Sequence, residues 1–205
     1  MNVAIYMEGG GRSLGSRAKL RQGMEVFLDE IRRACSARNW HWRLVCCGGR
    51  DEAYKGFRNE RANEDAGIVV LLVDSEDPVH AVNPSDHLTA RDGWILDGVD
   101  DNVVHLMVQT MEAWIVADPE ALSGYYKQGF QQDALPRHQN LEEVGKNDIA
   151  EALDRATQGS RQGRYHKIHH ARYLLQCIDP TRVRRRCHYC DRLFETLLRL
   201  VGPAD

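Results

Sequence analysis

The segment GIVVLLVDSEDP at 67–78 does most to constrain the fold of this 205-residue chain. The six residues after its first glycine are all apolar and mostly β-branched, which predicts a strand buried on both faces, as in a parallel sheet. The acidic residues Asp74 and Glu76 follow that strand directly. The chain opens in the same way, because its first apolar run ends at Glu8 and leads into three glycines. Two buried strands that both end in acidic residues need an explanation.

Strand and helix patterns alternate along the first half of the chain. Between the expected strands, residues 19–37 and 51–64 have the apolar spacing of amphipathic helices, and a proline-containing loop precedes the last strand. This alternation predicts an α/β fold with a mainly parallel four-stranded sheet flanked by helices. The strands are expected at 2–7, 41–47, 68–73 and 103–109.

The second half of the chain has helical spacing. We expect residues 1–118 to form an α/β domain and residues 119–205 to form a helical extension packed on it, as one compact unit. Helices are expected at 110–118, 119–127, 146–157, 165–177 and 188–201.

Composition narrows the location of the protein. No apolar run reaches the length of a membrane span, and no basic region with an apolar stretch opens the chain, so a cytoplasmic protein that does not bind membranes is expected. Its six cysteines are then expected to be reduced. Cys187 and Cys190 form a CxxC pair, but zinc needs four ligands and no second CxxC is present. Histidines 166, 169 and 170 could supply the others; we favour packing of the two cysteines between helices.

Charge is distributed unevenly along the chain. Residues 155–192 hold ten Lys and Arg but two acidic residues, and the rest of the chain is acidic, which gives a formal net charge of −3. A basic segment on an acidic body fits binding of a polyanion at one face. A solvated helical surface, or a surface that docks on the acidic body, explains the asymmetry equally well.

The position of the acidic residues predicts a function for them. Functional side chains of open α/β sheets gather beyond the carboxyl ends of the strands. If the first and third strands are neighbours, Glu8, Asp74 and Glu76 meet in one small volume, and such carboxylates repel unless a cation neutralises them. Oxygen ligands in this number suit Mg²⁺ or Mn²⁺. Glycines 9–11 would allow a substrate to approach, with Arg12 as a phosphate contact. A solvated strand end and a tight turn are the alternatives.

These residues carry a resemblance to known families. An acidic residue after the first strand (Glu8) and an acid-x-acid pattern after the third (Asp74, Glu76) resemble the TOPRIM domain of topoisomerases, primases, recombination proteins and overcoming-lysogenization-defect nucleases. The usual second residue of that pattern is Asp, where this chain has Glu76. Over nearly its whole length the chain is similar to the bacterial family of domain of unknown function 4276. The matching stretches are YMEGGG, CCGGRDEAYKGF, LLVDSEDP, HLTARDGW, HLMVQTMEAWIVAD, QGFQQDALP, GRYHK and CDRLFETL.

The resemblance implies a TOPRIM-like, Rossmannoid fold and a metal-dependent phosphoryl-transfer site, above all a nuclease for DNA or RNA. Glu8, Asp74 and Glu76 would bind one or two Mg²⁺ or Mn²⁺ ions. Relatives often lie beside an ABC- or AAA-type ATPase in settings of phage defence, which implies an ATPase partner and an anti-phage role.

Further residues are assigned hypothetical roles at such a site. Glu112 is a candidate second-metal ligand or general base, with helix capping as the alternative. Lys167 is a candidate for stabilising charge on the scissile phosphate, if its helix leans over the strand ends. Candidate contacts with the backbone of the nucleic acid are Arg164, Arg184, Arg185 and Arg186. A basic surface helix or contact with a partner protein is the alternative for these arginines.

Other residues near the strand ends have structural interpretations. His105 is expected to be a buried, hydrogen-bonded histidine, and Trp94 and Trp114 are expected to be core or loop anchors. Arg91 and Asp92 are expected to form an ion pair in a loop near the site.

Two classes of function remain, and a nucleotidyl-transferring or phosphatase activity at the same metal site is a third alternative. A nuclease explains the acidic cluster and the basic segment together. A non-catalytic TOPRIM-like subunit that binds a partner ATPase explains the whole-chain resemblance and Glu76 without any chemistry. Candidate partners are nucleic acid, the ATPase and a second copy of the chain. No Gly-x-x-x-x-Gly-Lys-Ser/Thr pattern is present, so the chain itself is not expected to hydrolyse ATP.

Overall fold

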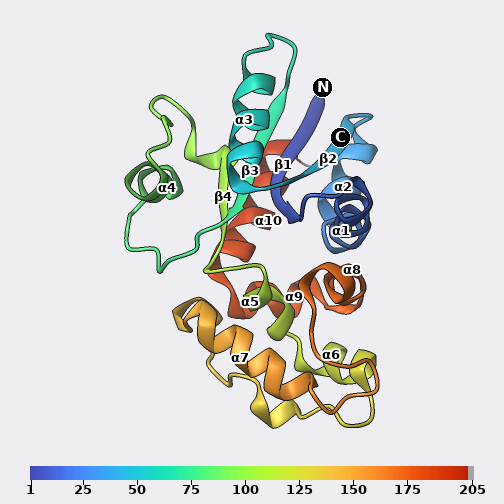
Figure 1. The fold of residues 1–205 in the computed structure, drawn as a ribbon. Coiled ribbons are helices and arrows are strands. Elements are labelled where there is room, and N and C mark those ends of the chain that lie inside the picture. Colours follow the sequence, from blue (N-terminus) through green and yellow to red (C-terminus); the bar gives the residue numbers. More distant parts are fainter. Residues whose placement is uncertain (203–205) are drawn as a thin grey trace.

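The computed structural model describes residues 1–202. Its strands form one sheet in the order β2-β1-β3-β4, and each neighbouring pair is parallel. This confirms the expected α/β fold with a parallel four-stranded sheet, and it makes β1 and β3 neighbours (Figure 1). The strands are β1 (Asn2–Gly10), β2 (His41–Gly48), β3 (Ile68–Asp74) and β4 (Val104–Met107).

Helices cover both faces of the sheet. Successive side chains of a strand point to opposite faces, so Ile5 and Met7 of β1 belong to one apolar cluster and Ala4 and Tyr6 to another. The first face packs mainly against α1, α2 and α10, and the second against α3 and α4. These helices are α1 (Leu14–Phe27), α2 (Asp29–Ala37), α3 (Arg50–Arg61), α4 (Pro84–Asp92) and α10 (His188–Val201).

The other helices lie beyond the carboxyl ends of the strands, in the lower half of the view in Figure 1. They are α5 (Glu112–Val116), α6 (Pro119–Tyr126), α7 (Lys146–Thr157), α8 (Lys167–Cys177) and α9 (Pro180–Arg186), with single 3₁₀ turns at Asp101–Val103, Gln132–Ala134 and Leu141–Glu143. Within residues 1–202, no helix combines the length and the apolar character that a membrane span requires.

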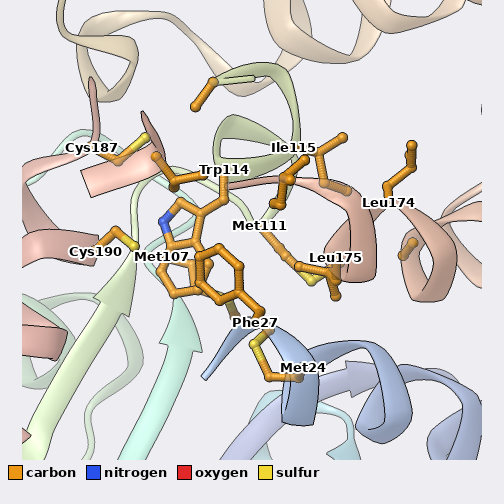
Figure 2. Packing of buried hydrophobic residues seen from close by; sticks show 14 of the residues in the cluster. Met24, Phe27, Met107, Met111, Trp114, Ile115, Leu174, Leu175, Cys187 and Cys190 are labelled. Carbon is orange, nitrogen blue, oxygen red and sulfur yellow. The ribbon is translucent and has the colours of Figure 1, made fainter. Parts of the chain in front are cut away.

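One apolar cluster joins these outer helices to the sheet. Trp114 of α5 is fully buried, and its ring stacks on Phe27 of α1 with 5.4 Å between the ring centroids. Figure 2 shows Met107 at the end of β4 and the buried Cys187 and Cys190 beside the same indole. Burial of one large aromatic side chain contributes roughly 1.5–3 kcal/mol. The contact therefore holds α5, and the segment that connects it to β4, against the sheet.

Some expected elements differ from the structure. The helix expected at 19–37 is divided at Leu28, whose backbone departs from helical geometry (φ −94°, ψ 17°) while its side chain is fully buried. Residues 84–92, expected as part of a loop, form α4, which begins with proline and ends at Gly93 in the left-handed conformation. Helix α9, capped by Asp179, was also not expected. Both short helices have ordinary start or stop signals, but their length hides any apolar periodicity.

Helices α1 and α8 approach each other closely at a glycine. A Cβ atom added to Gly23 of α1 would lie 2.6 Å from the carbonyl oxygen of Arg172 in α8, which is closer than any side chain permits. Glycine is thus required where the two backbones meet. Because Lys167 is the first residue of α8, this contact also helps to place that lysine.

We expect Gly23→Ala to lower the free energy of unfolding by about 1–3 kcal/mol, because the added methyl group overpacks the contact between the helices. This outweighs the gain of about 1 kcal/mol that alanine gives an unconstrained helix position. Gly15→Ala, on the same helix, is the control, since its added Cβ would meet nothing within 4 Å and should leave stability unchanged or slightly raised. Urea unfolding followed by circular dichroism measures both; equal effects would contradict the close contact.

Candidate metal centre

The strand order reverses direction at β1, and the acidic residues lie at that point. Because β2 lies on one side of β1 and β3 on the other, the crevice beyond their carboxyl ends is a topological switch point, where open α/β sheets bind ligands. Glu8 lies near the carboxyl end of β1, Asp74 ends β3, and Glu76 follows it. One carboxylate oxygen of each lies within 4.8 Å of the others, so the three residues form an acidic triad as the sequence predicts.

Backbone N–H groups fix the acidic triad. The N–H of Asp74 donates to Oε2 of Glu8 at 3.2 Å, and the N–H of Met111 donates to Oδ1 of Asp74 at 2.8 Å. The N–H of Glu76 donates to the carbonyl of Gln109 at 2.8 Å. Glu76 has a φ of +65°, a left-handed conformation that is disfavoured for a residue with a side chain. The turn brings its longer arm within reach of the other two carboxylates, and such strained residues concentrate at functional sites.

Lys167 joins two of the carboxylates from above the strand ends. Its Nζ lies 3.4 Å from Oδ2 of Asp74 and 3.2 Å from Oε2 of Glu112. The other oxygen of Glu112 accepts a hydrogen bond of 3.0 Å from the hydroxyl of Tyr165. Burial lowers the pKa of Lys167, but the Asp74 and Glu112 carboxylates outweigh it and raise this pKa above its ordinary value. The lysine is therefore a fixed positive charge beside the acidic triad.

Two further cations pair with the remaining carboxylates. Nζ of Lys146, the first residue of α7, lies 2.6 Å from Oε2 of Glu76. The backbone N–H of Lys146 also donates to the side-chain oxygen of Gln109, which anchors the start of the helix. Nη1 of Arg50 lies 3.8 Å from Oε2 of Glu8. Each member of the acidic triad thus has a cation from a different helix nearby.

Burial makes ionisation of two members of the acidic triad, Glu8 and Asp74, unfavourable. Desolvation, followed by the charge of Asp74, raises the pKa of Glu8 to about 7, against the opposing charge of Arg50. Desolvation likewise raises the pKa of Asp74 to about 6. Desolvation acts on Glu76 in the same direction, but Lys146 outweighs it and lowers the pKa of Glu76 below its ordinary value. Two carboxyls thus sit where a divalent cation would favour their ionised forms.

Three residues of the site were not identified from the sequence. Arg50 follows the two glycines after β2, and a cation directly beyond a strand end is a signal that could have revealed it. Tyr165 and Lys146 begin or precede helices far along the chain, and no local pattern connects them with the strand ends. Only the packing of α7 and α8 beyond the carboxyl ends of the strands brings them to the acidic triad.

A second group of charges lies on the β4 side of the acidic triad. Nη2 of Arg50 lies 2.6 Å from Oδ2 of Asp92, and Arg91 pairs with Asp92 at 2.5 Å and with Asp77 at 2.8 Å. The expected ion pair of Arg91 and Asp92 is present, although it lies in helix α4 and not in a loop. Arg50, which pairs with Asp92, also covers the ring of Trp94. Trp94 is buried, as expected for a core anchor.

The predicted nucleic-acid contacts divide into exposed and engaged side chains. Arg12 is exposed directly after the glycine loop at 9–11, and its carbonyl accepts a hydrogen bond from Arg17. Arg164 is exposed, and its Nη1 lies 2.7 Å from a carboxylate oxygen of Asp154.

The run of three arginines in α9 mostly contacts the protein itself. Nε of Arg184 lies 2.7 Å from Oδ1 of Asp191, and its guanidinium covers the ring of Phe194. Arg185 is exposed. Arg186 donates hydrogen bonds to the carbonyl oxygens of Val116, Ala117, Pro136 and His138. Much of the basic charge of this segment therefore stabilises the outer helices.

The CxxC pair has a structural environment. Cys187 and Cys190 are fully buried in the apolar cluster, in agreement with helix packing. Among the described residues, the acidic triad is the one group of three or more metal-ligating side chains, and neither cysteine belongs to it. His105 is likewise buried and hydrogen-bonded, to the carbonyl of Asn102 and to Arg192.

The arrangement suits a hard divalent ion. Its donors are carboxylate oxygens from two neighbouring strands, which Mg²⁺ and Mn²⁺ prefer. The acidic triad could therefore bind one such ion, with other positions left for water or phosphate oxygens. An ion there would share its ligands with the cationic side chains that now pair with them.

We expect the pH dependence of the free energy of unfolding to reveal the raised pKa of Glu8. Its pKa of about 7 in the folded state lies above the ordinary value of 4.5, so folding disfavours the ionised form, and stability is lost as pH rises from about 4.5 to about 7. Glu8→Gln removes this loss. It should raise the free energy of unfolding by about 1–3 kcal/mol at pH 8 and by much less at pH 5, in EDTA. Urea unfolding at the two pH values is the measurement.

Glu151→Gln is the matched control, because this carboxylate on α7 is 69% exposed. Its effect should be small at both pH values. A gain for Glu8→Gln that does not depend on pH would show that the Glu8 carboxyl has an ordinary pKa.

Comparison with protein families agrees with the resemblance to domain of unknown function 4276. A family model described as Domain of unknown function (DUF4276) matches residues 11–198, which is most of the chain. Neither the curated proteins nor the solved structures contain a significant match. The match begins at Gly11, the last residue of the glycine loop, and includes Asp74, Glu76, Glu112 and Lys167, whereas Glu8 precedes it. The chain therefore belongs to the DUF4276 family.

Proposed function

We propose that the protein is a divalent-metal-dependent nuclease of TOPRIM type, which hydrolyses phosphodiester bonds of DNA or RNA with Mg²⁺ or Mn²⁺ held by Glu8, Asp74 and Glu76. The convergence of these carboxylates within 4.8 Å at a topological switch point supports it best. Burial works against their ionisation, and strongly perturbed carboxyls in a crevice are characteristic of functional sites.

The surrounding residues fit phosphodiester hydrolysis. A bound ion would polarise the scissile phosphate and activate water. Lys167, already held by Asp74 and Glu112, is placed to stabilise negative charge that develops on the phosphate. Glu112, oriented by the hydroxyl of Tyr165, holds Lys167 and is the candidate second ligand or general base.

The proposal extends to partners. The exposed Arg12 beyond the glycine loop and the exposed Arg164 and Arg185 are available for the backbone of a nucleic acid. The resemblance to TOPRIM nucleases supports the same activity, and it supports a role as the effector of an anti-phage system that works in the cytoplasm with an ABC- or AAA-type ATPase.

One observation favours a non-catalytic role. Lys167, Lys146 and Arg50 already pair with the carboxylates, so much of the negative charge is compensated by the protein itself. A TOPRIM-like regulatory subunit that binds a partner ATPase would need no ion. The two functions differ in whether a divalent ion displaces these cations and whether cleavage follows.

Cleavage assays test the nuclease. The purified protein is incubated with plasmid DNA, single-stranded DNA and total tRNA, each with Mg²⁺, Mn²⁺ or EDTA. We expect cleavage that needs a metal ion and that falls about 100-fold or more in both Glu8→Gln and Lys167→Met, because a ligand or a fixed charge at the phosphate is lost. Glu151→Gln should cleave like the wild type. Absence of cleavage in every condition would favour the regulatory subunit.

Lys146→Met should strengthen metal binding, because it removes the ammonium group that competes with an ion for Glu76. The expected gain in Mn²⁺ affinity is about three- to fivefold, which corresponds to a partly exposed ion pair of up to about 1 kcal/mol. Titration calorimetry of both proteins measures it. Lys55→Met, which removes a lysine from an exposed pair on α3, should change nothing. Unchanged or weaker binding in Lys146→Met would mean that the ion does not use Glu76.

A further inference from the structure

A pocket opens beside the acidic triad. Its volume is about 440 Å³, within the range of about 300–1,000 Å³ that is typical of small-molecule sites. It lies between the glycine loop at 9–11, helix α1 and helix α8, and it shares Glu8 and Lys167 with the candidate metal centre. A chemical group inside this pocket would therefore be a direct neighbour of the ion and of the phosphate that the ion activates.

The buried part of the pocket is apolar. Leu20, Met111 and Ala171 line it and are each at most 5% exposed. The ring of Tyr165, whose hydroxyl is directed to Glu112, also lines it. These side chains offer flat, apolar contact surface and few hydrogen-bonding groups, which suits the face of an aromatic ring.

Two of the lining residues that reach solvent, Lys167 and Arg172, carry positive charge. Lys167 and His166 are exposed, Arg172 is partly exposed, and Ile168 is 40% exposed between them. A ligand that matches the pocket thus combines a flat apolar part, which enters, with an anionic part, which stays among the cations. A nucleotide has this combination, because its base has apolar faces and its phosphate is negative.

The glycine loop shapes the wall of the pocket that faces the strands. Gly9, Gly10 and Gly11 all have positive φ, and a Cβ on Gly9 would lie 2.7 Å from Cδ2 of Leu20. A Cβ on Gly11 would lie 3.4 Å from Cδ1 of Ile168. The loop therefore packs as bare backbone against α1 and α8, and its peptide groups are available for the polar edge of a base.

We infer that the pocket binds one unstacked nucleobase of the substrate, with the adjacent phosphate at the acidic triad; this inference rests on the proposed nuclease function. A base inside a duplex is stacked on both faces and cannot enter a pocket of this kind unless it leaves the stack. The substrate class is therefore nucleic acid with an unpaired base next to the cleaved bond: a loop, a bulge or a single strand.

A binding experiment without cleavage tests this inference. Two fluorescein-labelled duplexes are compared by fluorescence anisotropy, one with a single unpaired adenine and the other fully paired, as DNA and as RNA, with Ca²⁺ in place of Mg²⁺. We expect the wild type to bind the probe with the unpaired adenine about tenfold more tightly, since stacking of one base supplies a preference of this size.

Two pocket variants and one control complete the test. Ala171→Leu fills the pocket from its buried side, and Ile168→Glu adds a negative charge at its exposed side; each should abolish the preference. Gln176→Glu adds the same charge to an exposed position of α8 outside the pocket lining and should retain it. Circular dichroism shows whether each variant is folded, and Ile168→Glu keeps the test decisive if Ala171→Leu is not.

Each outcome bears on the inference. Equal affinity for the two probes, or a preference that survives in both pocket variants, overturns it, and metal-dependent cleavage by the same protein would then leave the proposed function intact. Absence of binding to both probes together with absence of cleavage overturns the inference and the proposed function alike. A preference that is lost in the pocket variants alone establishes the base pocket.

Discussion

The structure depends on the burial of a parallel sheet whose strand order reverses at β1. Continuous apolar strands require cover on both faces, so helices must pack there and leave the strand ends as the place where polar groups can gather. Glu8 lies near the carboxyl end of β1, and Asp74 ends the neighbouring strand β3. The same topology that stabilises the sheet thus forces carboxylates into a crevice where desolvation opposes their charge.

Compensation of that charge connects the two halves of the chain. Lys146 and Lys167 each begin a helix of the second half, and each pairs with a carboxylate that follows β3 or ends it. Apolar contacts, above all those around Trp114, hold these helices in place. The two lysines at their starts therefore lie close to the carboxylates. The candidate metal centre is in this sense also a joint between the sheet and the outer helices.

The sheet and the acidic triad could be predicted from the sequence because both depend on local patterns. An apolar run gives a strand, and the residue after it is placed by the strand itself, as for Asp74. Lys146 could not be predicted, because its position depends on how α7 packs and on its hydrogen bond with Gln109. Arg186 shows the converse: a basic run suggests a ligand, but carbonyl groups left unpaired at the ends of short segments are an equally good partner.

The two lysines differ in how binding of an ion would change their ion pairs. Lys167 has two carboxylate partners, so it can remain paired with Glu112 when Asp74 turns to an ion, and it stays where a phosphate would lie. In the described part of the chain, the ion pairs of Lys146 involve Glu76 alone, so the ion and this lysine compete for one group. When no ion is bound, Lys146 pairs with the carboxylate of Glu76, which would otherwise be unpaired. The same ion pair weakens the binding of an ion. Lys146 therefore stabilises the acidic triad when no ion is bound and lowers its affinity for an ion. Lys167, in contrast, can keep its position with or without an ion.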